Sequence, residues 1–244
     1  MPHIVGIMGN LGVGKTTMAS MMAYLWKQAI EAKGGSVKLF ANYDLYGADR
    51  MKLAEDWFKV AEAHGSICVW DEAHRSFNSR TALKMDNIIA TDILTFARKM
   101  AAIQIFATPS IARLDNRIRE MLEVLLHIRP AGNKGMHIDY YDFQADSYGR
   151  LGKLIHTRFL SSAKVAQIHK LNLFDSHSFV GGFPLPKTER AAQLFMDKLE
   201  ATHDKARGQL KNDYRTNGSF EQRPTALVVP FPRDSSSEVH ETFL

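Results

Sequence analysis

Short apolar runs alternate with longer amphipathic stretches along the first half of the chain. The apolar runs cover residues 4–8, 37–41, 67–70 and 103–107. The run 67–70 is apolar without interruption, which is typical of a central parallel strand that is covered on both faces. Between them apolar residues recur at helical spacing, which predicts helices over about 17–30, 49–64 and 88–97. Strands that alternate with helices predict an α/β fold with a mostly parallel sheet.

The pattern changes beyond residue 120. Three consecutive strands are predicted over 124–128, 136–144 and 151–160, the last two joined around Tyr148-Gly149 as a hairpin. These strands should extend the sheet in an antiparallel sense. A helix with an apolar stripe (Ala191, Phe195, Leu199) follows and should end near Gln209. From Asn212 onward Asn, Ser, Pro, Arg and Glu dominate, which predicts a flexible tail. Its segment 226–231 is apolar enough to dock on a neighbouring subunit or on the protein's own surface.

Composition is that of one ordinary globular protein. The 244 residues are 45% hydrophobic and 23% charged, enough for one α/β domain with an appendage. The single cysteine, Cys68, excludes a disulfide framework. The chain opens without a signal-peptide pattern and has no apolar run near the ~20 residues of a membrane span. We therefore expect a soluble, cytoplasmic protein. The net charge of +5 favours an anionic partner such as nucleic acid, although a basic enzyme without one fits equally well.

The most informative motif is G-x-x-x-x-G-K-[ST]. It is formed by Gly9, Asn10, Leu11, Gly12, Val13, Gly14, Lys15 and Thr16, with Thr17 opening the helix behind it. It lies between a predicted strand and a predicted helix, which is the context a phosphate-binding P-loop requires. The glycines let backbone N–H groups approach an anion, Lys15 should reach the β- and γ-phosphates, and Thr16 should ligate Mg²⁺. The cofactors expected are ATP and Mg²⁺.

A pair of acidic residues, Asp71 and Glu72, follows the strand 67–70. Ligands of open α/β sheets bind at the carboxyl ends of strands, so Asp71 should emerge beside Thr16 and complete the Mg²⁺ shell. Glu72 can then polarise a water for attack on the γ-phosphate. The alternative, a helix cap plus a first-turn acid, is less favoured when a P-loop lies upstream.

Two further catalytic elements are predicted less specifically. Thr108, at the end of the strand 103–107, is the candidate sensor of the γ-phosphate, and an ordinary turn threonine is the alternative. Four arginines are candidates to stabilise the transition-state charge, with at least one expected to act from an adjacent subunit: Arg80, Arg98, Arg117 and Arg119. Each alone also fits a solvated surface arginine.

In their order, several motifs resemble small ATPases of the FtsK–HerA superfamily. The segments are Asp71–Arg75, Ser79-Arg80, Phe96–Lys99, Ala107–Ser110, Leu114–Arg119 and Leu173–Ser176. The chain looks most like the viral branch, which comprises genome-packaging ATPases of membrane-containing viruses and zonula-occludens-toxin-like assembly proteins of filamentous phages. The resemblance covers roughly residues 1–180. It implies a ring, typically a hexamer, that moves DNA with ATP, together with a capsid or portal partner and a virion-associated or host-cytoplasmic location.

The chain departs from this superfamily at two points. A glutamine is common at the sensor position, whereas here Thr108 runs into Pro109 and Gln104 lies inside the strand. The filamentous-phage relatives usually carry a membrane-spanning helix beyond the ATPase domain, and none is predicted here. The second difference favours a soluble packaging motor. We expect a P-loop ATPase domain over 1–182, a C-terminal helix over 183–211 and a flexible tail over 212–244.

Three functions fit the sequence. The first is an ATP-driven DNA translocase, with Arg75, Arg80 and Lys84 as candidate pore contacts. The second is a phage assembly or secretion ATPase acting on coat or membrane proteins without pumping duplex DNA. The third is a nucleotide-switched scaffold, against which a poised base at Glu72 argues. Other P-loop classes fit less well, since Asn10 replaces the second lysine of partitioning ATPases and no Asn-Lys-x-Asp motif of GTPases occurs.

Overall fold

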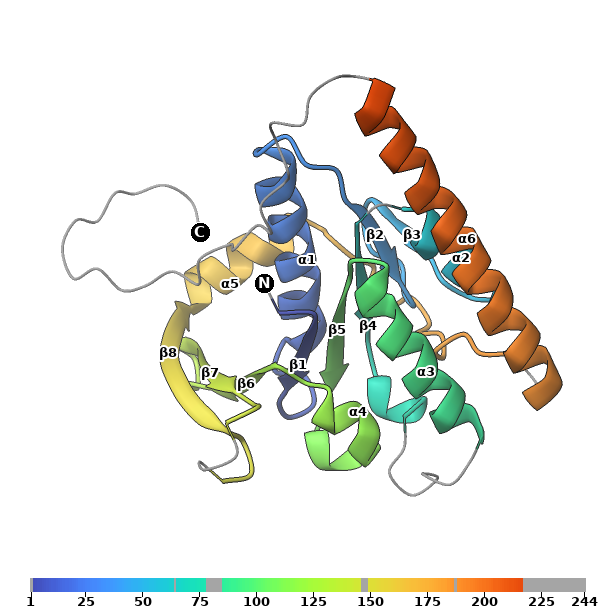
Figure 1. Cartoon of the computed structure of the whole chain (residues 1–244). Helices are drawn as coiled ribbons and strands as arrows, with labels where there is room; N and C mark the ends of the chain where they lie inside the picture. The colour runs from blue at the N-terminus through green and yellow to red at the C-terminus, as the bar shows by residue number, and fades with distance from the viewer. Residues whose placement is uncertain (1, 64, 78–84, 146–148, 187, 217–244) are drawn as a thin grey trace.

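The computed structural model describes residues 2–63, 65–77, 85–145, 149–186 and 188–216. Its strands are β1 (Ile4–Met8), β2 (Lys38–Ala41), β3 (Ala48–Arg50), β4 (Ser66–Trp70), β5 (Ala102–Thr108), β6 (Val124–Pro130), β7 (Gly135–Asp142) and β8 (Lys153–Ser161). They form one sheet in the order β3-β2-β4-β5-β1-β6-β7-β8 (Figure 1). The strands from β3 to β6 pair in parallel, and β7 and β8 pair antiparallel to their neighbours. The predicted α/β class with an antiparallel extension is confirmed.

Helices cover both faces of this sheet. The α-helices are α1 (Lys15–Glu31), α2 (Asp56–Glu62), α3 (Met85–Lys99), α4 (Asn116–Glu120), α5 (Ser162–Lys170) and α6 (Glu189–Thr216), and the short 3-10 turns are η1 (Ala73–Arg75) and η3 (Ile111–Arg113). One apolar core lies beneath α1 and α5, and the other lies beneath α2, α3, α4 and α6 (Figure 1). No helix in the described ranges is long and apolar enough to cross a membrane.

An aromatic cluster fills the second core behind the carboxyl end of β4. Trp70 of β4 stacks on Trp57 of α2 with ring centroids 5.5 Å apart, and Phe183 lies 4.6 Å from Trp70. Phe77 and Phe106 continue the cluster through edge contacts. Large aromatic side chains contribute much of the buried area of a core, so this cluster fixes β4 against α2 and the segment that carries Phe183.

The structure corrects the helix predicted over 49–64. Residues Ala48–Arg50 form β3, because their backbone pairs with the free edge of β2. The helix α2 begins only at Asp56, whose carboxylate accepts hydrogen bonds from the N–H groups of Lys52 and Leu53. These hydrogen bonds satisfy two N–H groups of the turn that precedes the helix.

Other differences lie in the second half of the chain. β6 was expected to be antiparallel but pairs in parallel with β1, whereas β7 and β8 pair antiparallel to their neighbours as expected. The helix α5 was not predicted, and it begins where the Ser161 hydroxyl accepts a hydrogen bond from the Lys164 N–H. The helix α6 continues to Thr216, past the predicted end at 211, since no glycine or proline interrupts residues 209–216. The segment 226–231 lies outside the described residues, and the division into domain, helix and tail stays a prediction.

One buried carboxylate joins β6, β7 and β8, the three strands that we call the extension. Asp139 on β7 is 3% exposed and accepts hydrogen bonds from Arg129 on β6 and from the Thr157 hydroxyl on β8, at 2.9 and 2.7 Å. The Arg129 guanidinium holds the pKa of Asp139 below its ordinary value. The Asp139 carboxylate is therefore stabilised in its charged form by neighbours on both sides.

We expect Arg129→Ala to lower the free energy of unfolding by about 1–2 kcal/mol, because it leaves a buried carboxylate with one partner, while the half-exposed position of Arg129 limits the loss. The lowered pKa contributes stability above the unfolded value of about 3.9, and this contribution is lost as the pH falls through the folded pKa. The difference in the free energy of unfolding between parent and variant, measured by urea denaturation, should therefore disappear below about pH 4. Arg207→Ala, at an exposed position of α6, is the control. A gap that is independent of pH would contradict this explanation.

Candidate nucleotide-binding site

The glycine-rich loop connects β1 to α1 at the carboxyl edge of the parallel strands. Gly12 and Gly14 have φ angles of 74° and 93°, which side-chain-bearing residues rarely adopt. Gly9 has a different constraint, because a Cβ there would lie 2.7 Å from the Ile128 carbonyl oxygen. Gly14 precedes α1 and offers no side chain to cap it, so the first N–H groups of the helix are available to an anion.

Lys15 lies inside this loop. Its side chain is 5% exposed, and its Nζ donates a hydrogen bond of 2.9 Å to the Asn10 carbonyl oxygen. A buried ammonium group requires compensating acceptors. One carbonyl partner leaves donor capacity on Nζ, which phosphate oxygens can fill.

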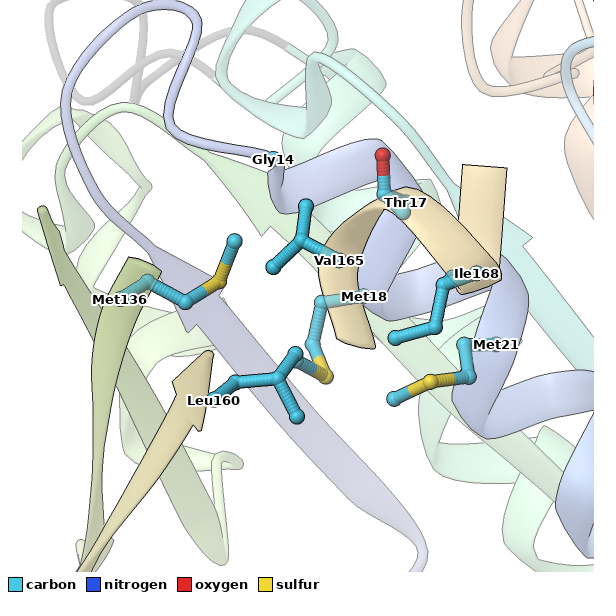
Figure 2. Close-up of a pocket in the computed structure, with 8 residues that line it drawn as sticks. All are labelled: Gly14, Thr17, Met18, Met21, Met136, Leu160, Val165 and Ile168. Atoms are coloured by element: carbon cyan, nitrogen blue, oxygen red, sulfur yellow. The ribbon is translucent and has the colours of Figure 1, made fainter. Parts of the chain in front are cut away.

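The base of the loop rests on methionine and aliphatic side chains. Figure 2 shows Met18 and Met21 of α1 converging with Met136 of β7 and with residues of β8 and α5 around a small apolar cavity. A Cβ on Gly14 would lie 3.4 Å from Met136 Cε. The cavity measures about 10 Å³, too small for a ligand, so it belongs to the packing that supports the loop.

The first turn of α1 meets the end of β4 across β5. Met8 of β1 is in register with Thr108 of β5, and Phe106 of β5 is in register with Trp70 of β4. The parallel strands therefore end at one edge, and there Thr16 Oγ1 donates a hydrogen bond of 2.8 Å to Asp71 Oδ2. Neighbouring oxygen ligands of an octahedral Mg²⁺ ion lie about 2.9 Å apart, so these two oxygens fit the metal.

Burial controls the charge of Asp71. The side chain is 7% exposed, and this burial raises the pKa of Asp71, although hydrogen bonds from Thr16 and from the Glu72 N–H counteract it. The adjacent Lys15 ammonium also acts to lower the pKa. A carboxylate that is poorly solvated in the ligand-free site gains from a divalent cation.

Glu72 adopts a left-handed backbone conformation with φ 50° and ψ 38°. This conformation is uncommon for glutamate and turns the chain away from the strand direction of β4. His74 Nδ1 lies 3.4 Å from Glu72 Oε2, and burial lowers the pKa of His74 although the Glu72 carboxylate acts to raise it. Neutral His74 therefore lies beside the candidate base.

Thr108 ends β5 between the loop and Asp71. It is fully buried, and its hydroxyl donates to the Ser110 carbonyl oxygen at 3.2 Å. Gln104 lies at the opposite end of β5, in register with Ile4, and accepts a hydrogen bond from Trp70 Nε1. Of these two polar residues of β5, only Thr108 is near the loop.

The candidate arginines are spread over the molecule. Arg117 and Arg119 lie on α4, which follows the carboxyl end of β5. Arg98 lies at the end of α3, beside the start of β5, and thus at the sheet edge opposite the loop (Figure 1). Arg80 and Lys84 lie outside the described residues. The structure thus brings Lys15, Thr16, Asp71, Glu72 and Thr108 together, and it does not bring Arg98 to them.

Three residues near the site were not assigned there from the sequence. Asn42 holds the backbone of Asp71, His74 adjoins Glu72, and the Arg113 guanidinium is close enough to lower the pKa of His74. His74 lies within the motif segment Asp71–Arg75 and Arg113 directly precedes Leu114–Arg119, so their position in the sequence is a signal for both. Asn42 lies 29 positions before Asp71 and carries no motif.

The sheet order, the loop and the Thr16–Asp71 pair define a P-loop nucleoside triphosphatase fold. Residues 22–178, more than half of the chain, match the family described as "Zonular occludens toxin (Zot)", and the chain belongs to this family. The assignment agrees with the resemblance drawn from the motifs. The loop itself precedes the matched range.

Solved structures of similar fold have low sequence identity to the chain. The N-terminal domain of zonular occludens toxin from Neisseria meningitidis is 20% identical with a TM-score of 0.47, over 77% of this chain and 96% of that one. B204, the DNA-packaging ATPase from Sulfolobus turreted icosahedral virus, is 14% identical with a TM-score of 0.43, over 64% and 99%. No curated protein matches the chain.

We expect Asp71→Asn to stabilise the ligand-free protein by about 1 kcal/mol at neutral pH, because the amide carries no buried charge. Since the pKa of Asp71 is raised, the contribution of this one carboxyl to the stability of the parent is fully present below the unfolded value of about 3.9 and is lost as the pH rises through the folded pKa. The advantage of the variant in thermal unfolding should therefore grow above about pH 4. Asp92→Asn, on the exposed face of α3, is the control. Equal melting temperatures of the parent and Asp71→Asn at every pH would refute the prediction.

Proposed function

We propose that the protein is a Mg²⁺-dependent ATPase that moves DNA during the assembly of a virus particle. The observation that carries the proposal is the 2.8 Å contact between Thr16 Oγ1 and Asp71 Oδ2, with Glu72 directly after it. These residues lie 55 positions apart and meet at the helix end where an anion is favoured. A metal pair and an adjacent carboxylate are the parts that γ-phosphate hydrolysis requires.

In the proposed reaction each side chain has one task. Lys15 moves from the Asn10 carbonyl to the β- and γ-phosphate oxygens, and the loop N–H groups orient the phosphates. Thr16 and Asp71 hold Mg²⁺, which when bound neutralises charge on these oxygens. Glu72 orients a water and accepts its proton. Thr108, next to the loop, contacts the γ-phosphate, and an arginine from α4 or from a second subunit stabilises the developing charge.

Two observations support DNA as the substrate of the motor. The first is the net charge of +5, which favours a polyanion as partner. The second is the family to which the chain belongs, because the motifs resemble both this family and packaging ATPases. We propose a homo-oligomeric ring, a hexamer by resemblance, that grips the phosphate backbone without reading sequence and works with a capsid or portal protein.

A second function is an assembly ATPase that acts on coat or membrane proteins without pumping duplex DNA. The family match favours it, since the motifs link zonula-occludens-toxin-like proteins to filamentous-phage assembly. A nucleotide-switched scaffold is less well supported, because a switch needs no carboxylate at the position of Glu72. The first two functions differ in whether DNA changes the rate of hydrolysis.

We expect steady-state ATP hydrolysis to be stimulated by duplex DNA, and to fall about 10²–10⁴-fold in Glu72→Gln, which removes the proton acceptor. Rates are measured without DNA, with duplex and with single-stranded DNA. The stimulation should weaken steeply with salt because it depends on phosphate contacts. Glu62→Gln, an exposed glutamate of α2, is the control. Hydrolysis that is indifferent to both DNAs would favour the second function, and an unchanged rate in Glu72→Gln would refute the base assignment.

We expect Lys15→Ala to abolish nucleotide binding and Glu72→Gln to retain ATP in a stable oligomer. The first variant loses the cation that contacts the phosphates, whereas the second loses only the hydrolytic step. Fluorescent-nucleotide titration and size-exclusion chromatography with light scattering measure the two effects. Lys27→Ala, on the same helix but away from the loop, should bind nucleotide like the parent. ATP binding by Lys15→Ala at parental affinity would contradict the assignment.

A further inference from the structure

Asn42 holds the backbone of the metal-binding aspartate. It follows β2 and is 2% exposed. Its Nδ2 donates to the Asp71 carbonyl oxygen at 3.0 Å, and its Oδ1 accepts from the Asp71 N–H at 2.9 Å. One side-chain amide thus satisfies both backbone groups of Asp71.

Asp71 needs these partners because it lies beyond the ladder of the sheet. The pairing of β4 with β5 ends at Trp70, and its pairing with β2 ends at Val69. Beyond Asp71 the chain turns sharply at Glu72. Buried backbone groups without partners are costly, so the Asn42 amide extends the hydrogen bonding of the sheet by the one residue that carries the metal carboxylate.

The same amide binds a distant segment. Asn42 Nδ2 also donates to the Gly181 carbonyl oxygen at 2.7 Å, and the Gly181 N–H donates to the Asn42 carbonyl at 2.7 Å. Gly181 belongs to residues Leu173–Pro184, which we call the strap and which lie on the chain between α5 and α6 (Figure 1). Phe183 anchors the strap in the aromatic cluster, and its N–H binds the Ser76 hydroxyl beyond Glu72.

The chemistry of this contact requires an amide. Both hydrogens of Nδ2 are directed to carbonyl oxygens, those of Asp71 and Gly181, while Oδ1 accepts the Asp71 N–H. An aspartate of the same shape would place an oxygen against two carbonyl oxygens. An alanine would leave three buried polar groups without these partners.

We propose that Asn42 is a positioning residue that orients Asp71 toward Mg²⁺ and couples the metal site to the strap. The proposal rests on the function proposed above. Removal of a group that orients a metal ligand lowers the affinity for the metal by about 10–100-fold. The hydrogen bonds of the Asn42 amide go to Asp71 and Gly181 rather than to the glycine-rich loop. Loss of this amide should therefore affect the metal-dependent part of nucleotide binding alone.

The test compares the binding of a fluorescent, non-hydrolysable ATP analogue in Mg²⁺ and in EDTA. Mg²⁺ should increase the affinity for the analogue at least about tenfold less in Asn42→Asp than in the parent, and the affinity in EDTA should be the same in both. Higher Mg²⁺ should restore part of the gain. Hydrogen exchange at the strap should rise in the same variant, because the Gly181 contact is lost.

Two further variants make the test specific. Ser178→Ala removes a strap contact with the Asp44 carboxylate, away from Asp71, and should keep the full Mg²⁺ gain. Gly181→Ala brings a Cβ to 3.2 Å from the Asn42 carbonyl and should lose a smaller part of the gain, which keeps the proposal testable if Asn42→Asp does not fold. Equal Mg²⁺ gains in parent, Asn42→Asp and Gly181→Ala would overturn the role of Asn42. A parent that binds no nucleotide would overturn the proposed function and this inference with it.

Discussion

The parallel register of β1, β5 and β4 is the constraint on which the rest of the structure depends. Because these three strands run in the same direction and end together, the loop after β1 and the acidic pair after β4 emerge at one edge. The hydrogen bond between Thr16 and Asp71 then joins groups 55 residues apart. A shift of one strand by one residue would move Asp71 away from Thr16 and would also turn each side chain of that strand from one apolar core into the other, because both faces of these strands are buried.

Several polar groups at this edge are buried before any ligand arrives. Lys15 and Asp71 are both nearly inaccessible, and Glu72 has a left-handed backbone. Each of these features costs free energy in the ligand-free fold. The apolar cores and the aromatic cluster offset that cost, so the site is held ready by packing that takes no part in the chemistry.

Segments far from the motifs support the site from two sides. On one side the extension contributes Met136 beneath Gly14 and the Ile128 carbonyl beside Gly9. On the other side the strap reaches Asn42 and the residues after Glu72. Changes in either segment can therefore alter the geometry of the loop or of the acidic pair without touching a motif residue.

Local sequence determined the strands β1, β2, β4 and β5, the loop, and the candidates Lys15, Thr16, Asp71 and Glu72, because apolar runs, helical spacing and the glycine pattern act over short ranges. It could not predict β3 or the parallel pairing of β6, because these depend on which strand edges are free. It also could not identify Asn42, since an asparagine after a strand is ordinary until Asp71 and Gly181 are placed against its amide. The tertiary structure decided these features because the hydrogen bonds involved join residues that only the folded chain brings together.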